Sequence, residues 1–188
     1  MLKNFIRPML LMLTVLLWGC QSTAPAPEPR PQPNPAVTQL FNQAMGQLKQ
    51  GELDGAEALL EQVLRLDDKL PGARLNLAII SHKRGDSARA KALIDSALAL
   101  APMPEALNLR GVLARQEGDF RAAEADFTKA LTQAPGYAAA HYNLALLYDL
   151  YLQQPEKAAF HCRQYLAQSG DSEATPWLEE LSRRAVNE

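Results

Sequence analysis

The sequence predicts an all-α protein in which about four helix-turn-helix repeats follow one another and a further helix closes the array. Three observations lead to this prediction. Glycines recur at positions 51, 85 and 118, spaced by 34 and 33 residues. Alanine and larger apolar residues recur at fixed distances after each glycine, and alanine and leucine dominate the second half of the chain. Repeats of this length indicate helical hairpins that stack on their neighbours.

Composition limits the class of protein further. The chain has 188 residues, a formal charge of -2 and three histidines, which is typical of one soluble globular domain. The first 19 residues carry Lys3 and Arg7 and no acid, so the remainder has 17 basic against 21 acidic side chains. A phosphate-binding surface normally needs the opposite sign, and no nucleic-acid partner is expected.

Residues 1–19 have the pattern of a secretory signal peptide. MLKNFIR supplies two positive charges, and an apolar run of about 11 residues follows. A permanent membrane-spanning helix needs roughly 20 apolar residues, so this run is too short for one. We therefore expect the chain to be exported from the cytoplasm.

LWGC at residues 17–20 resembles the lipobox of bacterial lipoproteins, although Trp18 departs from the small or apolar residues usual there. The resemblance implies that Cys20 is the lipid attachment site and the first residue of the mature chain, anchored by acyl chains such as palmitate. In lipoproteins of Gram-negative cells, Asp directly after the lipidated cysteine favours retention in the inner membrane. This chain has Gln21 at that position, so the resemblance implies that it is anchored at the periplasmic face of the outer membrane. Cys162 lies in an apolar helical pattern and is expected to be a buried, inert thiol.

Residues 20–35 are predicted to be a tether between the lipid and the folded domain. The segment APAPEPRPQPNP at 24–35 has proline at every second position, which favours an extended polyproline II chain of ~3.1 Å per residue. A recognition motif for a proline-binding domain is the alternative.

The folded domain is expected at residues 36–188. Each repeat has one helix before its glycine, which permits the left-handed end of that helix, and a second helix after it, capped by an acidic residue. A proline ends the second helix in the second and third repeats. In the fourth repeat Leu152-Gln153-Gln154-Pro155 replaces the glycine turn, so a longer first helix is expected there. The predicted repeats span about 37–70, 71–103, 104–137 and 138–171, with a capping helix at about 173–186.

This pattern resembles the tetratricopeptide repeat (TPR), a helix-turn-helix unit of 34 residues. In the third repeat the residues at the marked positions of that family are Leu107, Gly111, Gly118, Ala123, Phe127, Ala130 and Pro135. The resemblance implies a right-handed TPR solenoid that binds a protein or peptide. Lipoproteins that look similar include type IV pilus pilotins, Tad-type pilus assembly lipoproteins and adaptors of peptidoglycan hydrolases.

Catalytic chemistry is not expected. His82, His141 and His161 are predicted to stand alone on different helices, and adjacent His161 and Cys162 point about 100° apart on a helix. The sequence has no glycine-rich phosphate loop. We therefore predict no enzyme activity, no metal, no cofactor and no small-molecule substrate.

The first helices of the repeats are predicted to line a groove that binds the partner. Asparagine recurs there once per repeat, and side-chain amides can hold an extended peptide backbone. The alternative is that these asparagines bond water or the adjacent turn. The predicted groove residues are Phe41, Asn42, Met45, Leu75, Asn76, Ile79, Asn108, Val112, Arg115, Tyr142, Asn143 and Leu146.

Together these patterns predict a lipid-anchored periplasmic adaptor or scaffold that binds a protein in its groove and supports assembly of an envelope complex, such as pilus, secretin or cell-wall machinery. The alternative is a structural subunit of an outer-membrane or energy-transducing complex, which would use the convex face or the capping helix.

Overall fold

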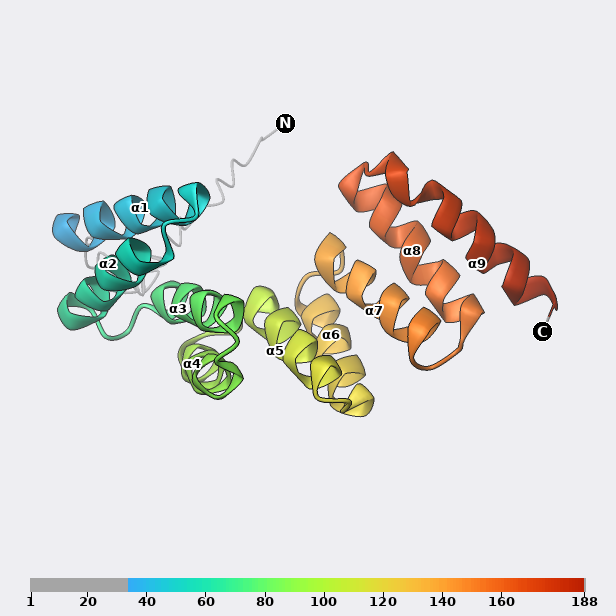
Figure 1. The fold of residues 1–188 in the computed structure, drawn as a ribbon, viewed down its shortest axis with the longest axis horizontal. Helices are drawn as coiled ribbons and strands as arrows, with labels where there is room; N and C mark the ends of the chain where they lie inside the picture. Colours follow the sequence, from blue (N-terminus) through green and yellow to red (C-terminus); the bar gives the residue numbers. More distant parts are fainter. Residues whose placement is uncertain (1–33, 188) are drawn as a thin grey trace, which may run out of the picture. The chain divides into compact units, whose positions relative to one another are not determined.

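A computed structural model describes residues 34–187 (Figure 1). The predicted signal peptide, Cys20 and nearly all of the predicted tether lie outside these residues. The described part contains nine α-helices, one short 3-10 helix and no strand, so the all-α prediction is confirmed. The helices are α1 Pro35–Gln50, α2 Leu53–Leu66, α3 Pro71–Lys83, α4 Ser87–Leu100, α5 Pro104–Gln116, α6 Phe120–Gln133, α7 Ala138–Leu150, α8 Pro155–Ser169, η1 Ser172–Ala174 and α9 Thr175–Asn187.

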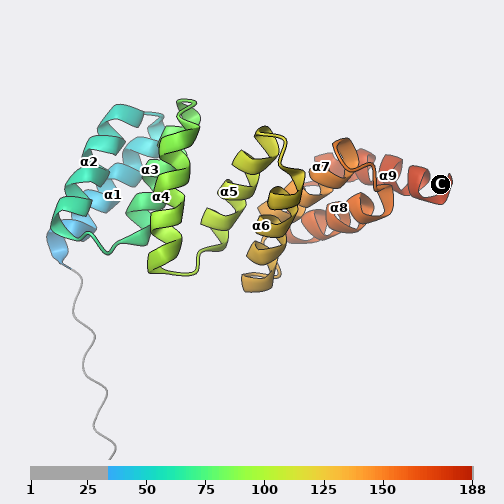
Figure 2. The same cartoon turned by 90° about the horizontal axis from the view of Figure 1, so that it is seen from below.

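The helices pack in consecutive pairs. α1 packs mainly on α2, α3 on α4, α5 on α6 and α7 on α8, and each second helix also contacts the helix that follows it. Figures 1 and 2 show these pairs following one another in chain order. No helix in the described part is both long enough and apolar enough to cross a membrane.

A glycine followed by an acidic residue forms the turn inside each of the first three pairs. The glycines at 51, 85 and 118 have φ of 81°, 80° and 83°, a left-handed conformation that costs glycine little. Asp86 and Asp119 then accept a hydrogen bond from the backbone N–H three residues later, as the sequence predicts. Glu52, at the same place in the first pair, makes no such side-chain bond.

The fourth pair turns without glycine. Gln153 takes the left-handed conformation instead, with φ of 51°, and the Gln154 N–H donates to the Tyr148 carbonyl at 2.9 Å. The extra residue is therefore absorbed in the turn. The prediction of a longer first helix is wrong, because α7 has 13 residues, as α3 and α5 do.

Small residues allow the two helices of a pair to approach closely. Ala44, Ala78 and Ala145 are buried in α1, α3 and α7, and Gly111 takes the same place in α5. A Cβ on Gly111 would lie 2.6 Å from a ring carbon of Phe127, so only glycine fits against this ring.

The last helix closes the apolar core, as predicted. Leu181 is fully buried, and Trp177 and Leu178 pack against the same cluster of α7 and α8 residues. Cys162 is buried in this cluster, and burial raises the pKa of its thiol, consistent with an inert role.

Candidate partner-binding surface

The predicted groove residues come from α1, α3, α5 and α7, and we call them together the first-helix surface. Ten of the twelve leave part of their side chain accessible, and Asn42 and Tyr142 are exposed. The other two, Leu75 and Asn143, are buried, at 6% and 8% exposure. The helices therefore present most, but not all, of the predicted side chains to a partner.

Leu75 belongs to the core. It packs in one apolar cluster with Ala106 at the start of α5 and with Ile94 of α4. The next helix pair thus covers Leu75, and a partner bound to this surface would not contact it.

The four asparagines make different interactions. Asn143 Nδ2 donates to Asn108 Oδ1 at 2.9 Å, which links α7 to α5. Asn76 Nδ2 donates to the Gly72 carbonyl of its own helix at 2.8 Å. Asn42 is exposed. An asparagine amide has two donors and two acceptor positions, so the accessible side chains of Asn42, Asn76 and Asn108 retain capacity for a peptide backbone, whereas Asn143 is buried.

An apolar cavity of about 310 Å³ adjoins the first-helix surface at its first pair. Phe41 and Val37 of α1 line it on one side, and Leu70, Pro71 and Gly72 close it on the other. A Cβ on Gly72 would lie 3.7 Å from the Phe41 ring, at ordinary van der Waals distance, so Gly72 faces Phe41 across this space. The sequence did not indicate this cavity, since a loop and two helices form it together.

Aromatic rings gather at the opposite end of the surface. The Tyr142 ring centroid lies 5.1 Å from that of Tyr165 and 5.8 Å from that of Trp177. Asp149 accepts a hydrogen bond from the Trp177 indole at 2.7 Å and forms an ion pair with Arg184. Asp149 thus holds α9 in place.

Arg115 is the cationic member of the predicted set. Its guanidinium lies 5.9 Å from the centroid of the Tyr151 ring, within cation–π range. Its Nε atom is buried and has no hydrogen-bond acceptor among the described residues. Because this Nε atom is buried, a partner could not reach it without movement of the side chain.

Two of the histidines meet, so the prediction that each stands alone is wrong. His141 and His161 approach to 3.0 Å between their Nδ1 atoms, and His141 Nε2 lies 3.0 Å from the Pro135 carbonyl oxygen. Burial, followed by the nearby His141 and Lys157, lowers the pKa of His161 to about 4. The described residues contain no group of three or more side chains that could hold a metal ion.

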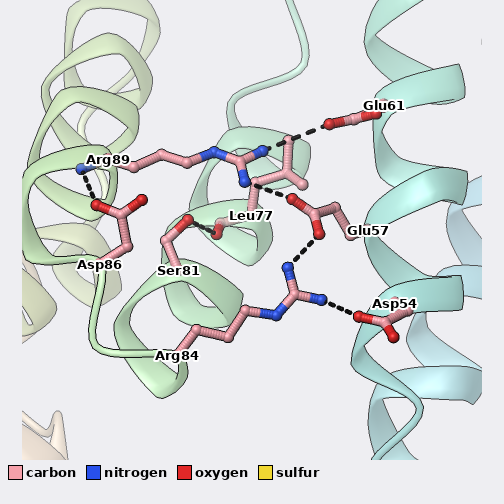
Figure 3. A network of polar contacts seen from close by, with 8 residues as sticks. All are labelled: Asp54, Glu57, Glu61, Leu77, Ser81, Arg84, Asp86 and Arg89. Atoms are coloured by element: carbon pink, nitrogen blue, oxygen red, sulfur yellow. Dashed lines mark hydrogen bonds and ion pairs between the residues drawn. The ribbon is translucent and has the colours of Figure 1, made fainter.

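A second surface carries most of the charge pairs between helix pairs. Figure 3 shows Arg84 and Arg89, at the α3–α4 turn, both reaching Glu57 of α2. These contacts lower the pKa of the Glu57 carboxyl, with the Arg84 hydrogen bond as the largest cause. We call this network and its counterpart around Arg110 the ion-pair surface, which comprises Asp54, Glu57, Glu61, Arg84, Arg89, Asp95, Arg110 and Asp126.

Arg110 is the centre of the second half of this surface. It donates to Asp126 through two nitrogens at 2.7 and 2.8 Å, and to Asp95 at 3.0 Å. Asp126 is only 9% exposed, and its hydrogen bond is the main cause that raises the pKa of Arg110. The fork geometry joins α5 and α6 to α4.

Comparison with known proteins agrees with this architecture. Residues 47–113 and 104–137 each match the tetratricopeptide repeat. No curated protein sequence matches the chain.

Solved structures show the same fold. They include pilF of Pseudomonas aeruginosa, at 19% identity and a TM-score of 0.71, with 81% of this chain and 70% of that chain covered. The MamA protein has 20% identity and a TM-score of 0.60, with 81% and 87% covered. A thermophilic TPR protein of Thermus thermophilus has 22% identity and a TM-score of 0.66, with 80% and 84% covered. The fold is thus a TPR solenoid, a class of scaffold for protein–protein interaction.

Proposed function

We propose that this chain is a lipid-anchored adaptor that binds a protein partner on its first-helix surface and supports assembly of an envelope complex at the outer membrane. One observation carries the binding part of this proposal: the ion-pair surface satisfies its charges internally, whereas the first-helix surface leaves side chains such as Asn42 and Tyr142 exposed. Exposed amide and aromatic side chains suit an extended peptide.

The location is proposed from the sequence. The signal-like residues 1–19, the lipobox cysteine Cys20 and Gln21 support anchoring at the periplasmic face of the outer membrane of a Gram-negative bacterium. Three acyl chains bind a bilayer far more strongly than one, at ~0.8 kcal/mol per buried CH₂. Changing Cys20→Ser should release the protein from membranes, and continued sedimentation of the variant with the membrane fraction would contradict the anchor.

We propose which envelope complex the chain assembles from its resemblance to known lipoproteins. Type IV pilus pilotins and Tad-type pilus assembly lipoproteins are similar in having a lipidated cysteine followed by tetratricopeptide repeats. The likeness to pilF of Pseudomonas aeruginosa is one of fold, and it agrees with a pilus or secretin partner without singling it out.

Affinity capture from envelope extracts tests the adaptor. The full tagged chain, solubilised in detergent, serves as bait beside an Asn76→Arg/Tyr142→Glu variant, which alters the middle and the far end of the first-helix surface. A partner lost only with the variant supports the proposal. Partners retained by a folded variant would place binding elsewhere.

One observation favours the alternative of a structural subunit. Phe160 is 51% exposed, and it lies on α8, the second helix of its pair, and not on one of the helices that form the first-helix surface. Large exposed apolar side chains often mark protein contacts. If Phe160→Glu removes the chain from its complex while Asn76→Arg/Tyr142→Glu does not, the structural role replaces the adaptor role.

A further inference from the structure

Two histidines from neighbouring helices face each other through their ring nitrogens. His141 lies on α7 and His161 on α8, and their Nδ1 atoms are 3.0 Å apart. His141 is buried, whereas His161 keeps part of its side chain accessible. The pair belongs to neither the first-helix surface nor the ion-pair surface, so what it binds is independent of the proposed adaptor function.

Hydrogen bonds fix where the protons of this pair lie. His141 Nε2 lies 3.0 Å from the Pro135 carbonyl oxygen, which can only accept, so Nε2 carries a hydrogen. In the neutral ring Nδ1 then holds a lone pair, and this lone pair accepts a hydrogen bond from the Nδ1–H of His161. A single proton therefore lies between two imidazole nitrogens where α7 meets α8.

His141 is oriented as metal-binding histidines usually are. A histidine that binds a metal through one nitrogen almost always donates its other N–H to a carbonyl or carboxylate oxygen, which fixes the tautomer and the ring. The bond from His141 to the Pro135 carbonyl is of this kind, and it leaves Nδ1 as the ligand atom. Because only 6% of His141 is exposed, packing also holds the ring.

Aromatic rings hold His161 from two sides. Its ring stacks on that of Tyr148, with centroids 5.7 Å apart, and lies nearly perpendicular to that of Phe160, with centroids 5.0 Å apart. The His161 Nε2 atom has no hydrogen-bond partner among the described residues, since the bond of this ring is made through Nδ1. Nε2 can therefore take up the proton in the other neutral tautomer and leave Nδ1 as a ligand.

The separation of the two nitrogens suits two ligands of one ion. Imidazole nitrogens bind Zn²⁺ at about 2.0 Å, so two of them are roughly 2.8 Å apart at a right angle and roughly 3.3 Å apart at the tetrahedral angle. The observed 3.0 Å lies between these values. Replacing the proton by an ion thus requires the rings to turn until both lone pairs converge, but little movement of the helices.

Charged neighbours leave the surroundings of the pair close to neutral. Glu124 accepts a hydrogen bond from the Tyr148 hydroxyl, and the Lys157 ammonium lies 4.9 Å from the centroid of the Tyr148 ring. One acid and one base therefore flank the ring that stacks on His161. Cys162, the next residue, is fully buried in the apolar cluster of α7, α8 and α9, so its thiol does not join the two imidazoles.

From this geometry we propose that His141 and His161 bind one divalent transition-metal ion through their Nδ1 atoms. On binding, the His161 proton moves through solvent from Nδ1 to Nε2, so that both rings stay neutral and each Nδ1 donates one lone pair. Imidazole ligands favour Cu²⁺, Ni²⁺ and Zn²⁺, with Cu²⁺ bound most tightly, over Mg²⁺ and Ca²⁺. The described residues offer no third imidazole, thiol or carboxylate ligand, so water completes the coordination.

Metal titration tests the proposal directly. The full chain carries a tag without histidine, is solubilised in detergent and is freed of metal with EDTA. Isothermal titration calorimetry with CuSO₄ or ZnCl₂ should show one ion per chain, with Cu²⁺ bound more tightly than Zn²⁺. A large excess of MgCl₂ should not displace either ion. No binding of Cu²⁺ by the wild-type chain, or displacement by Mg²⁺, would overturn the inference.

A matched pair of variants locates the site. His161→Gln should weaken Cu²⁺ binding by about tenfold or more, because loss of even an outer-shell contact costs about 10–100-fold in metal affinity. His82→Gln is the control, since it removes a partly accessible imidazole on α3 that makes no hydrogen bond with a described residue. It should bind as the wild type does. Equal weakening in both variants would show adventitious binding to accessible histidines and would contradict the site.

Electron paramagnetic resonance of the Cu²⁺ complex identifies the ligands without relying on a variant. The wild-type spectrum should show coupling to two imidazole nitrogens. Coupling to backbone nitrogens, or to one imidazole only, would refute binding by the pair.

Binding should also stabilise the fold, because the ion joins α7 to α8. An excess of ZnCl₂ should raise the Tm of the wild type and of His82→Gln but not that of His161→Gln, since an ion that binds the folded chain shifts the folding equilibrium. Circular dichroism without metal confirms that each variant is folded. An equal rise in Tm for His161→Gln would contradict the proposal.

Discussion

The first-helix surface and the ion-pair surface come from the same repeats but satisfy their polar groups differently. On the ion-pair surface, Arg110 donates three hydrogen bonds to two carboxylates and joins neighbouring helix pairs. On the first-helix surface, Arg115 of the same helix α5 has a buried nitrogen without an acceptor among the described residues. We propose that the ion-pair surface links the repeats and that the first-helix surface binds the partner.

The largest effect is expected in the core that both surfaces share. Phe127 is fully buried, and its removal leaves a cavity against Gly111. Phe127→Ala should lower the free energy of unfolding by about 3–5 kcal/mol, measured by urea denaturation. Phe160→Ala, on an exposed side chain of the next second helix, should cost less than about 1 kcal/mol. Equal costs would contradict the placement of the core.

The two arginines of α5 provide the sharpest comparison. Arg110→Ala leaves Asp126 buried without its cation and should cost roughly 2 kcal/mol of stability. Arg115→Ala should change the free energy of unfolding by less than about 0.5 kcal/mol and reduce partner binding instead. Urea unfolding and partner capture on the same two proteins measure both effects. The comparison fails if Arg115 proves to be the more stabilising residue.

The histidine pair makes stability depend on pH. The pKa of His161 is about 4 in the folded chain, below its ordinary value of 6.5, so the unfolded chain binds more protons between these values. Stability is therefore full above about pH 6.5 and declines as the pH falls towards 4. After allowance for partial exposure, the loss due to His161 should be on the order of 1–2 kcal/mol.

Urea unfolding at several pH values checks this dependence. The variant His161→Gln cannot take up the proton, so its stability should change less between neutral and acidic pH than that of the wild type. An unchanged slope in the variant would assign the acid sensitivity to other groups.

The smallest effect is expected at the asparagine link between α5 and α7. Removing the Asn143–Asn108 hydrogen bond should cost about 1 kcal/mol, and Asn143→Ala and Asn108→Ala should not be additive. A double-mutant cycle in urea measures the coupling. Full additivity would mean that the two amides act independently and would contradict the link between α5 and α7.

The sequence predicted the helical framework well because the repeat is a local pattern. The helix pairs fall where the glycine spacing placed them, and Asp86 and Asp119 cap their helices as expected. In the fourth pair the pattern failed, because Gln153 can take a left-handed conformation that the sequence signals only for glycine.

The candidate site was predicted only in outline. The helical register identified which residues lie on the same face of a helix. It did not identify which of them the next helix pair buries. Leu75 was therefore assigned to the groove, although it packs in an apolar cluster with Ala106 of α5. Likewise, His141 and His161 are 20 residues apart and meet only when α7 packs on α8. Contacts between helices depend on packing angles that periodicity does not specify.

Site-specific photocrosslinking tests the central claim most directly. A photoreactive phenylalanine analogue replaces Tyr142 on the first-helix surface or Phe160 on α8 in the full chain, expressed in its own host. Both side chains are aromatic and similarly exposed, at 40% and 51%. We predict a covalent adduct with a discrete envelope protein at position 142 and none at position 160. An adduct at position 160 alone would contradict the assignment of partner binding to the first-helix surface.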